Sequence, residues 1–274
     1  MIDDSVMMTT KSASQKGIIL KSSDEIETMR RAGALVCKVL DHVCGLVKVD
    51  ATTGELNEIA EKMISDAGAE ALFKGVVNPA ASYPFPAALC TSVNDEVVHG
   101  VPGDRALKAG DIISIDCGVR IEGFCGDSAR TVAVGEVPDD VQSLLNVTES
   151  SLELAISEMK VGRMWSEVAT AIQKKVESAG MSVVREFVGH GIGQEMHEEP
   201  KVPNYHDRSQ RKSDFCLEEG MTLAVEPMVT LGKSDVMYAD QDAWVIVTKD
   251  GSFAAHFEHS IAMTSSGPEI LTRG

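Results

Sequence analysis

The sequence predicts an α/β fold (an α+β arrangement) in which two related halves each contain a pair of helices followed by strands. Three observations support this prediction. Capped apolar stripes occur at helical spacing, short apolar runs end in carboxylates, and both features repeat along the chain at a nearly constant shift. The 274 residues are enough for one large domain with a sizeable core.

Two helices are predicted in the first half. One begins after Ser22, because Glu25 lies three residues later in the pattern of a capping box, and an apolar stripe follows. The other begins after Thr52, where Glu55 completes a second capping box. It is expected to stop at Gly68, because glycine commonly ends a helix.

The second half is predicted to repeat this order. One helix opens at Pro138 and continues to about Met159, and another begins near Ser166 and stops at Ala179-Gly180. The join between the halves is expected within residues 135–140.

Two separate comparisons indicate an internal duplication. The helical segment 55–68 aligns with 167–180, and the apolar run Gly110–Asp116 aligns with Gly220–Glu226. The alternative is that any two helix–strand units look alike, but it does not readily explain why both alignments need nearly the same shift along the chain. We therefore expect Asp116 and Glu226 to lie symmetrically about one central site.

Residues 1–18 are expected to form a flexible N-terminal tail, because they are polar and lack the apolar centre of a signal peptide. Residues 19–274 then form a single domain with halves of about 19–137 and 138–274. No apolar stretch reaches the roughly 18 residues that a membrane span needs.

Charge and cysteine usage exclude several classes of protein. The net charge of −17 disfavours tight binding to nucleic-acid phosphates, and most of the acidity is expected to be a solvated surface. The six cysteines form no Cys-x-x-Cys pair, which disfavours a zinc ribbon and is typical of reduced thiols in the cytoplasm.

Several potential metal ligands lie at the ends of short apolar or glycine-rich runs. Burying an isolated carboxylate costs several kcal/mol unless a partner compensates the charge. A shared divalent metal centre would stabilise all of these carboxylates together. The five candidates are Asp116, Asp127, His190, Glu226 and Glu258.

Asp116 and Asp127 flank Ile121-Glu122-Gly123, which is a plausible hairpin turn. Such a hairpin would place the two aspartates opposite each other or one step off, with Cβ atoms about 4.5–5.5 Å apart. The alternative is a surface hairpin with acidic tips, which the apolar residues around Asp116 disfavour.

His190 is flanked by glycines that let the backbone approach a site, and His197 follows seven residues later. A lone histidine is more often a satisfied polar group, but two occur here in a chain with seven. One nitrogen with four carboxylates suits Mn²⁺, Fe²⁺, Co²⁺ or Zn²⁺ in pairs. No His-Glu-x-x-His helix or Gly-x-Ser-x-Gly elbow occurs.

Taken together, six segments resemble type I methionine aminopeptidase, in that family's order and across about residues 20–265. The resemblance implies the pita-bread fold, in which two pseudo-symmetric halves surround a dinuclear metal site. It also implies a cytoplasmic, metal-dependent aminopeptidase that removes the initiator methionine when the next residue is small. The segments are Ser92–Pro102, Asp116–Asp127, Gly189–Gly193, Met196–Pro200, Val225–Met228 and Phe257–His259.

The resemblance also implies roles for individual residues. The five candidates would hold two divalent ions (Co, Mn, Fe, Zn or Ni), with Asp127 and Glu258 bridging. His99 and His197 would contact the substrate, His197 would stabilise the tetrahedral intermediate, and Glu226 is a candidate to move the proton of the attacking water. The methionine pocket would draw on Phe85, Cys90, Met196 and Trp244, with Tyr83 as a further candidate.

The implied partners are peptides and nascent chains with N-terminal methionine, and transient contact with the ribosome surface; the protein is expected to be a monomer. Three departures from the family pattern stand out. Met196 lies where relatives often carry an aromatic, Asn78–Pro84 does not match their usual cysteine- and tyrosine-bearing pattern, and Asn204–Leu217 is slightly longer. The N-terminal extension of some relatives is absent.

Two alternatives stay open. A proline-specific peptidase of the same fold would usually carry an additional N-terminal domain, which the roughly 20 leading residues cannot supply. A metal-free homologue that acts only as a binding protein would have lost ligands, whereas all five candidates are present here.

Overall fold

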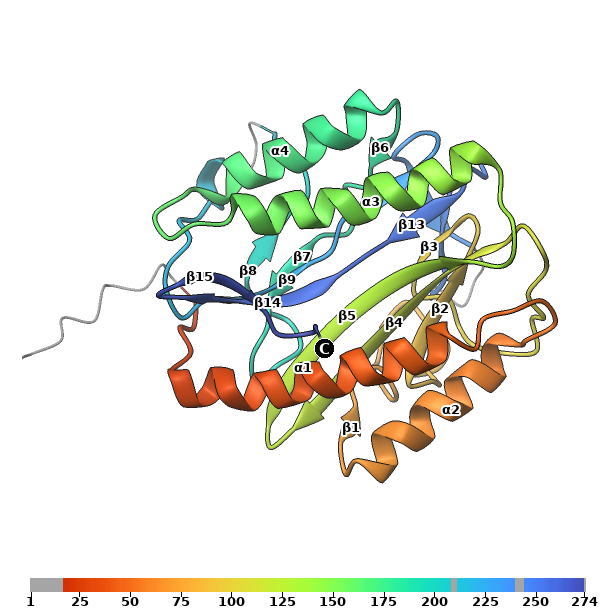
Figure 1. Cartoon of the computed structure of the whole chain (residues 1–274), viewed down its shortest axis with the longest axis horizontal. Helices are drawn as coiled ribbons and strands as arrows, with labels where there is room; N and C mark the ends of the chain where they lie inside the picture. Colours follow the sequence, from red (N-terminus) through yellow and green to blue (C-terminus); the bar gives the residue numbers. More distant parts are fainter. Residues whose placement is uncertain (1–16, 208–210, 240–243, 274) are drawn as a thin grey trace, which may run out of the picture.

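The computed structural model describes residues 17–207, 211–239 and 244–273. Figure 1 shows helices α1 and α2 on one side of the strands and helices α3 and α4 on the other. In chain order the elements are α1 Ser23–Cys44, α2 Thr53–Asp66, β1 Glu70–Ala71, β2 Leu89–Val93, β3 Glu96–Val98, β4 Ile112–Ile121, β5 Phe124–Ala133, α3 Asp139–Glu158, α4 Trp165–Ser178, β6 Ser182–Val183, β7 Gly189–Gly191, β8 Glu198–Val202, β9 Thr222–Val225, β10 Met228–Thr230, β11 Val236–Tyr238, β12 Ile246–Thr248, β13 Ala254–His256, β14 His259–Thr264 and β15 Gly267–Ile270.

The four predicted helices are confirmed. Both capping boxes form, with the Ser22 and Thr52 side chains accepting from the backbone N–H groups of Glu25 and Glu55. Helices α3 and α4 begin without a side-chain cap, and α4 starts at Trp165, one residue before the predicted position. None of the helices in the described ranges combines the length and apolarity that a membrane span requires.

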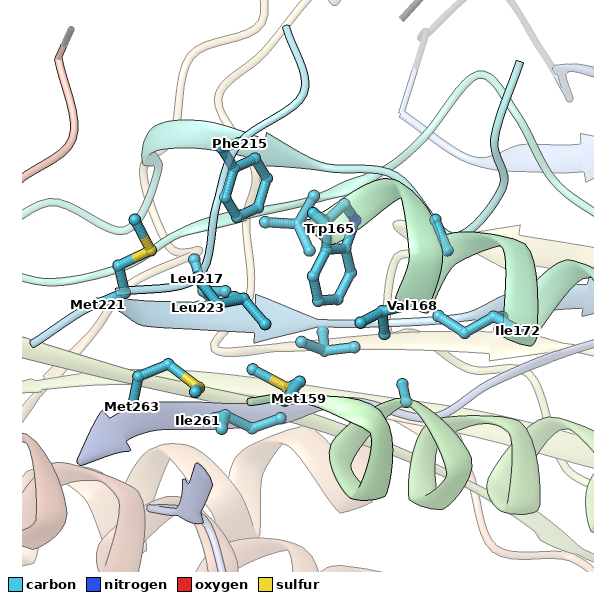
Figure 2. Packing of buried hydrophobic residues seen from close by; sticks show 14 of the residues in the cluster. Met159, Trp165, Val168, Ile172, Phe215, Leu217, Met221, Leu223, Ile261 and Met263 are labelled. Atoms are coloured by element: carbon cyan, nitrogen blue, oxygen red, sulfur yellow. The ribbon is translucent and has the colours of Figure 1, made fainter. Parts of the chain in front are cut away.

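Each half contributes one of the two larger sheets, with an apolar core packed against it, and β3 of the first half pairs with β12 of the second. In the first half, β4 pairs with β1, β2 and β5, and α1 and α2 pack on this sheet. In the second half the strand order is β15-β14-β9-β7-β8, covered by α3 and α4. Figure 2 shows Trp165 beside Phe215 above β9, with Met159 and Ile261 below, and the two aromatic rings stack with centroids 5.8 Å apart.

The hairpin of β4 and β5 corrects the expected placement of its two aspartates. Asp116 lies opposite Ala129, and Asp127 lies opposite Gly118, so the aspartates are two positions apart along the ladder. They are neither opposite each other nor one step off. Because side chains alternate with period two, the even offset keeps both carboxylates on one face, whereas a one-step offset would separate them.

The two halves also share their strand register. Ile115 lies opposite Arg130 in the first half, and Val225 lies opposite His259 in the second. The strands that carry Ile115 and Val225 are thus each paired antiparallel with a later strand of their own half, which supports the predicted relation between the halves.

Residues 17–21 form a segment that we call the N-terminal strap. Most of the predicted tail, residues 1–16, lies outside the described residues. Ile18, which was assigned to that tail, is buried and pairs with Glu199. Lys21 forms a buried ion pair with Glu198, so the strap holds the segment that follows His197.

Gly33 lies where helix α1 touches the C-terminal segment. A Cβ at this position would be 2.2 Å from the carbonyl oxygen of Leu271. Alanine is favoured over glycine in a helix by about 1 kcal/mol, but overpacking against backbone costs about 1–3 kcal/mol. We expect Gly33→Ala to lower the melting temperature in thermal denaturation.

The matched control for this prediction is Gly103→Ala, where no heavy atom lies within 4 Å of an added Cβ. Its melting temperature should equal that of the wild type. If Gly33→Ala melts at the wild-type temperature or above, helix α1 is less tightly fixed than the structure indicates.

Candidate metal centre

All five predicted ligands converge on one cavity of about 250 Å³. Asp116 and Asp127 come from the β4–β5 hairpin of the first half. The other three ligands, on β7, directly after β9 and directly before β14, come from the second half. The site is therefore assembled between the halves, as the duplication predicts.

The ligand atoms are close enough to share ions. Those of Asp127, His190 and Glu258 lie within 4.8 Å of one another. His190 Nε2 is 3.6 Å from Glu226 Oε1. His190 Nδ1 lies 2.9 Å from the carbonyl oxygen of Gly191, to which it donates in the Nδ1–H tautomer. That tautomer directs the Nε2 lone pair towards the carboxylates, as outer hydrogen bonds do for metal-ligating histidines.

Several buried polar atoms at this site have no hydrogen-bond partner among the described residues. They are Asp116 Oδ1, Asp127 Oδ1, Glu258 Oε1 and His256 Nε2. Buried polar groups in folded proteins are rarely unpaired. These oxygen and nitrogen atoms face one cavity and have no protein partner. Bound divalent cations would supply the missing partners. The residues present therefore fit a metal centre.

Burial also shifts the ionisation of these groups. It raises the pKa of Asp116 to about 7. The pKa values of the other three carboxyls lie well above their ordinary range, because of burial and then the neighbouring carboxylates. Burial, helped by His197, lowers the pKa of His190 to about 4, so its imidazole is neutral, the form that binds metals.

The free energy of unfolding of the metal-free protein should depend on pH, because the pKa of Asp116 is raised in the folded state. The folded carboxyl keeps its proton, whereas the unfolded one ionises near pH 4. Its stabilising contribution is therefore full below about pH 4 and is lost as the pH rises through about 7. Relative to the wild type, metal-free Asp116→Asn should gain stability between pH 5 and pH 7.

Comparison with the variant cancels the contribution of the buried histidines, whose lowered pKa values shift stability in the opposite direction in both proteins. Urea denaturation after chelation with EDTA measures the difference. A difference between the two proteins that stays constant from pH 5 to pH 7 would contradict the prediction.

The two predicted substrate-contacting histidines line the same cavity. The ring of His197 lies 4.3 Å from that of His190 at 70°. The ring of His99 lies 5.6 Å from that of Phe187, and burial lowers the pKa of His99 to about 4. Neither histidine belongs to the group whose donor atoms lie within 4.8 Å of one another.

The four residues predicted for the methionine pocket form an apolar wall of the cavity. The rings of Phe85 and Trp244 meet edge to face, with centroids 5.1 Å apart, and Cys90 and Met196 lie on the same wall. Tyr83 is 37% exposed, and its carbonyl oxygen accepts a 3.0 Å hydrogen bond from Trp244 Nε1. Tyr83 itself is not among the residues that line the cavity, and this hydrogen bond links its backbone to Trp244.

The cavity also contains residues to which the sequence assigned no role in the site. They come from separate loops and strands, and no local pattern joins them. His256 carries the one available signal, since it lies two residues before Glu258 at the end of an apolar run. The others are Phe73, Val76, Val98, Phe187, Val188 and Met228.

The chain is similar in sequence and in structure to known peptidases. Residues 27–265 match metallopeptidase family M24. A methionine aminopeptidase of Clostridium perfringens is 45% identical over 255 residues, which cover 93% of this chain and 98% of that protein. The crystal structure of a methionine aminopeptidase from Thermotoga maritima superposes with a TM-score of 0.87 at 39% identity, covering 94% of this chain and 100% of that one.

A more distant neighbour is an Xaa-Pro dipeptidase from Bacillus anthracis, with a TM-score of 0.71 at 22% identity. The match covers 93% of this chain but 62% of that protein. Similarity at this level shows the fold alone.

Proposed function

Because this chain belongs to metallopeptidase family M24, we propose that its five converging ligands hold two divalent metal ions. The chain is a methionine aminopeptidase of the pita-bread fold, a metal-dependent hydrolase that removes N-terminal methionine. The observation that carries the proposal is the group of buried carboxylate oxygens without partners around His190.

The number of ions follows from charge. Four buried carboxylates would carry four negative charges when ionised, and buried charge is costly without compensation. One divalent ion would leave half of that charge uncompensated, whereas two would neutralise it. Asp127 is close to His190 and Glu258 and also interacts with Asp116, which supports its role as a bridge.

When bound, a pair of divalent ions lowers the pKa of water and polarises a carbonyl group. The protein's own side chains do the rest. Neutral His99 and His197 line the cavity and donate to the substrate, and His197 stabilises the oxyanion of the tetrahedral intermediate. Glu226 takes the proton of the attacking water on a carboxylate oxygen and returns it to the leaving amine.

The cavity wall accounts for selection of methionine. Phe85, Cys90, Met196 and Trp244 offer an apolar surface that suits an unbranched thioether side chain. Burial of such a side chain contributes about 1.5–3 kcal/mol. The acidic ligands at the other end of the cavity favour a free terminal amine.

Peptide hydrolysis tests this proposal. After reconstitution with Co²⁺, Mn²⁺, Fe²⁺, Zn²⁺ or Ni²⁺ in turn, we expect Met-Ala-Ser to be cleaved and Ala-Ala-Ser and Met-Leu-Ser to be cleaved slowly. Norleucine peptides should still be cleaved, because one or two methylenes discriminate by only about 10–200-fold. Equal rates for N-acetyl-Met-Ala-Ser and Met-Ala-Ser, or a preference for Ala-Pro peptides, would favour the proline-specific alternative.

We further propose that the protein acts in the cytoplasm on nascent chains, as a monomer with transient contact to the ribosome surface. All six cysteines are free thiols. Free thiols are typical of a reducing compartment, which supports the proposed cytoplasmic location. Sedimentation of the purified protein with and without ribosomes tests both the monomer and the contact.

A further inference from the structure

His256 is a buried histidine that faces the five ligands without being one of them. Its Nε2 atom lies 3.7 Å from Glu226 Oε2 and 4.0 Å from Glu258 Oε2. The side chain is 3% exposed, and no described residue forms a hydrogen bond with Nε2. A polar nitrogen in this position requires a partner.

The separations indicate what kind of partner fits. They exceed the roughly 2.7–3.2 Å of an N–H···O hydrogen bond. Two donors bound to one ion at about 2.0–2.2 Å each can lie up to about 4.3 Å apart. His190 shows the same relation, with its Nε2 3.6 Å from Glu226 Oε1. The Glu226 carboxylate thus lies between two imidazole nitrogens, one facing each oxygen.

The internal duplication gives an independent argument. In the first half, Asp127 lies opposite Gly118. In the second half, His256 lies opposite Met228. The alignment of the halves that places Asp116 on Glu226 also places Gly118 on Met228.

His256 therefore occupies, in the second half, the position that Asp127 occupies in the first. Asp127 is one of the proposed ligands, and its side chain lines the same cavity as His256. The duplicated scaffold thus presents a donor at this position from each half.

We propose that His256 is a sixth protein ligand of the metal centre, binding through Nε2. This inference rests on the proposed dinuclear site. The donor set then contains two imidazoles and four carboxylates. Imidazole suits Zn²⁺, Fe²⁺ and Ni²⁺, whereas an all-oxygen set suits Mn²⁺. His256 thereby shifts the preference of the centre away from Mn²⁺.

Proton NMR of the full-length protein loaded with two equivalents of Co²⁺ tests the proposal. Ring protons of a cobalt-bound imidazole are strongly shifted, and histidine with a deuterated ring identifies them. We expect two sets of strongly shifted imidazole resonances in the wild type and one in His256→Gln. Calorimetry should show binding of Co²⁺ or Zn²⁺ weakened in His256→Gln by at least the roughly 10–100-fold that losing an outer hydrogen-bond partner of a ligand costs.

His206→Gln is the matched control, because His206 lines a different cavity near Trp165 and Asp214. It should keep both sets of resonances and the wild-type affinity. Near-ultraviolet circular dichroism of each variant verifies folding, and two sets of shifted resonances that both persist in folded His256→Gln would overturn the proposal.

One set of strongly shifted resonances in the wild type, unchanged in His256→Gln, would overturn the assignment of His256 as a ligand. The proposed methionine aminopeptidase function would still stand. A wild-type protein that binds no divalent ion would instead overturn the dinuclear site itself. The two failures are therefore distinguishable.

Discussion

Asp127→Asn should abolish both stoichiometric metal binding and methionine release. The Asp127 carboxylate is 4% exposed, and its donor atom lies within 4.8 Å of those of His190 and Glu258. An amide has one weaker oxygen donor and no charge, so it cannot bridge two cations. A bound ion lowers the pKa of water from about 15.7 to about 7, so losing it should reduce kcat/KM by well over about 10³-fold.

Metal content by mass spectrometry and cleavage of Met-Ala-Ser are measured on the same preparation. Asp104→Asn, at an exposed position outside the cavity, is the control and should retain both properties. Asp127→Asn protein with wild-type metal content and wild-type turnover would show that the bridge is assigned to the wrong residue.

His197→Ala should retain the metal ions and slow turnover by about 10²–10³-fold, the usual effect of losing one donor to a developing oxyanion. The His197 ring lies 4.3 Å from the His190 ring and lines the cavity, yet His197 is outside the compact group of donor atoms. The family resemblance, rather than this geometry, assigns its contribution to the substrate, since the candidate ligands Asp116 and Glu226 also lie outside that group.

A comparison of kcat with KM separates this role from simple binding. An interaction made in the transition state lowers kcat and kcat/KM together, whereas uniform binding raises KM alone. Metal analysis accompanies the kinetics, and His206→Ala serves as the control. A His197→Ala protein that lacks metal would make His197 a ligand and change the assignment of roles.

The helices and the candidate ligands that line the cavity could be predicted from the sequence because their signals are local. A capping box needs two residues three apart, as at Ser22 and Glu25, and the structure forms it. A carboxylate at the end of an apolar run, as at Glu226, already implies a compensating partner. The structure brings these scattered signals into one cavity.

The hairpin register could not be predicted, because it depends on the backbone of two turn residues. Glu122 and Gly123 both have left-handed φ, at 49° and 85°. Such a two-residue turn is commonly signalled by Asn-Gly or Asp-Gly, and glutamate at the first position gives no such signal. The offset between Asp116 and Asp127 follows directly from this turn.

His256, Phe187 and Met228 were missed for a different reason. Each is a single residue on its own strand or loop, and only strand pairing brings them to the cavity. Once the register is known, the duplication identifies His256 as the counterpart of Asp127. Sequence comparison of the halves alone lacks that register.

The N-terminal strap has an evolutionary consequence. Lys21 and Glu198 bury opposite charges, and removing one partner of such a pair costs about 3–5 kcal/mol. Neither position can then mutate alone without a large loss of stability, so the two should covary across lineages, either kept as a pair or replaced together by apolar residues. Glu198 directly follows His197, which lines the cavity. A lysine outside the cavity therefore limits which sequences the segment carrying His197 can adopt.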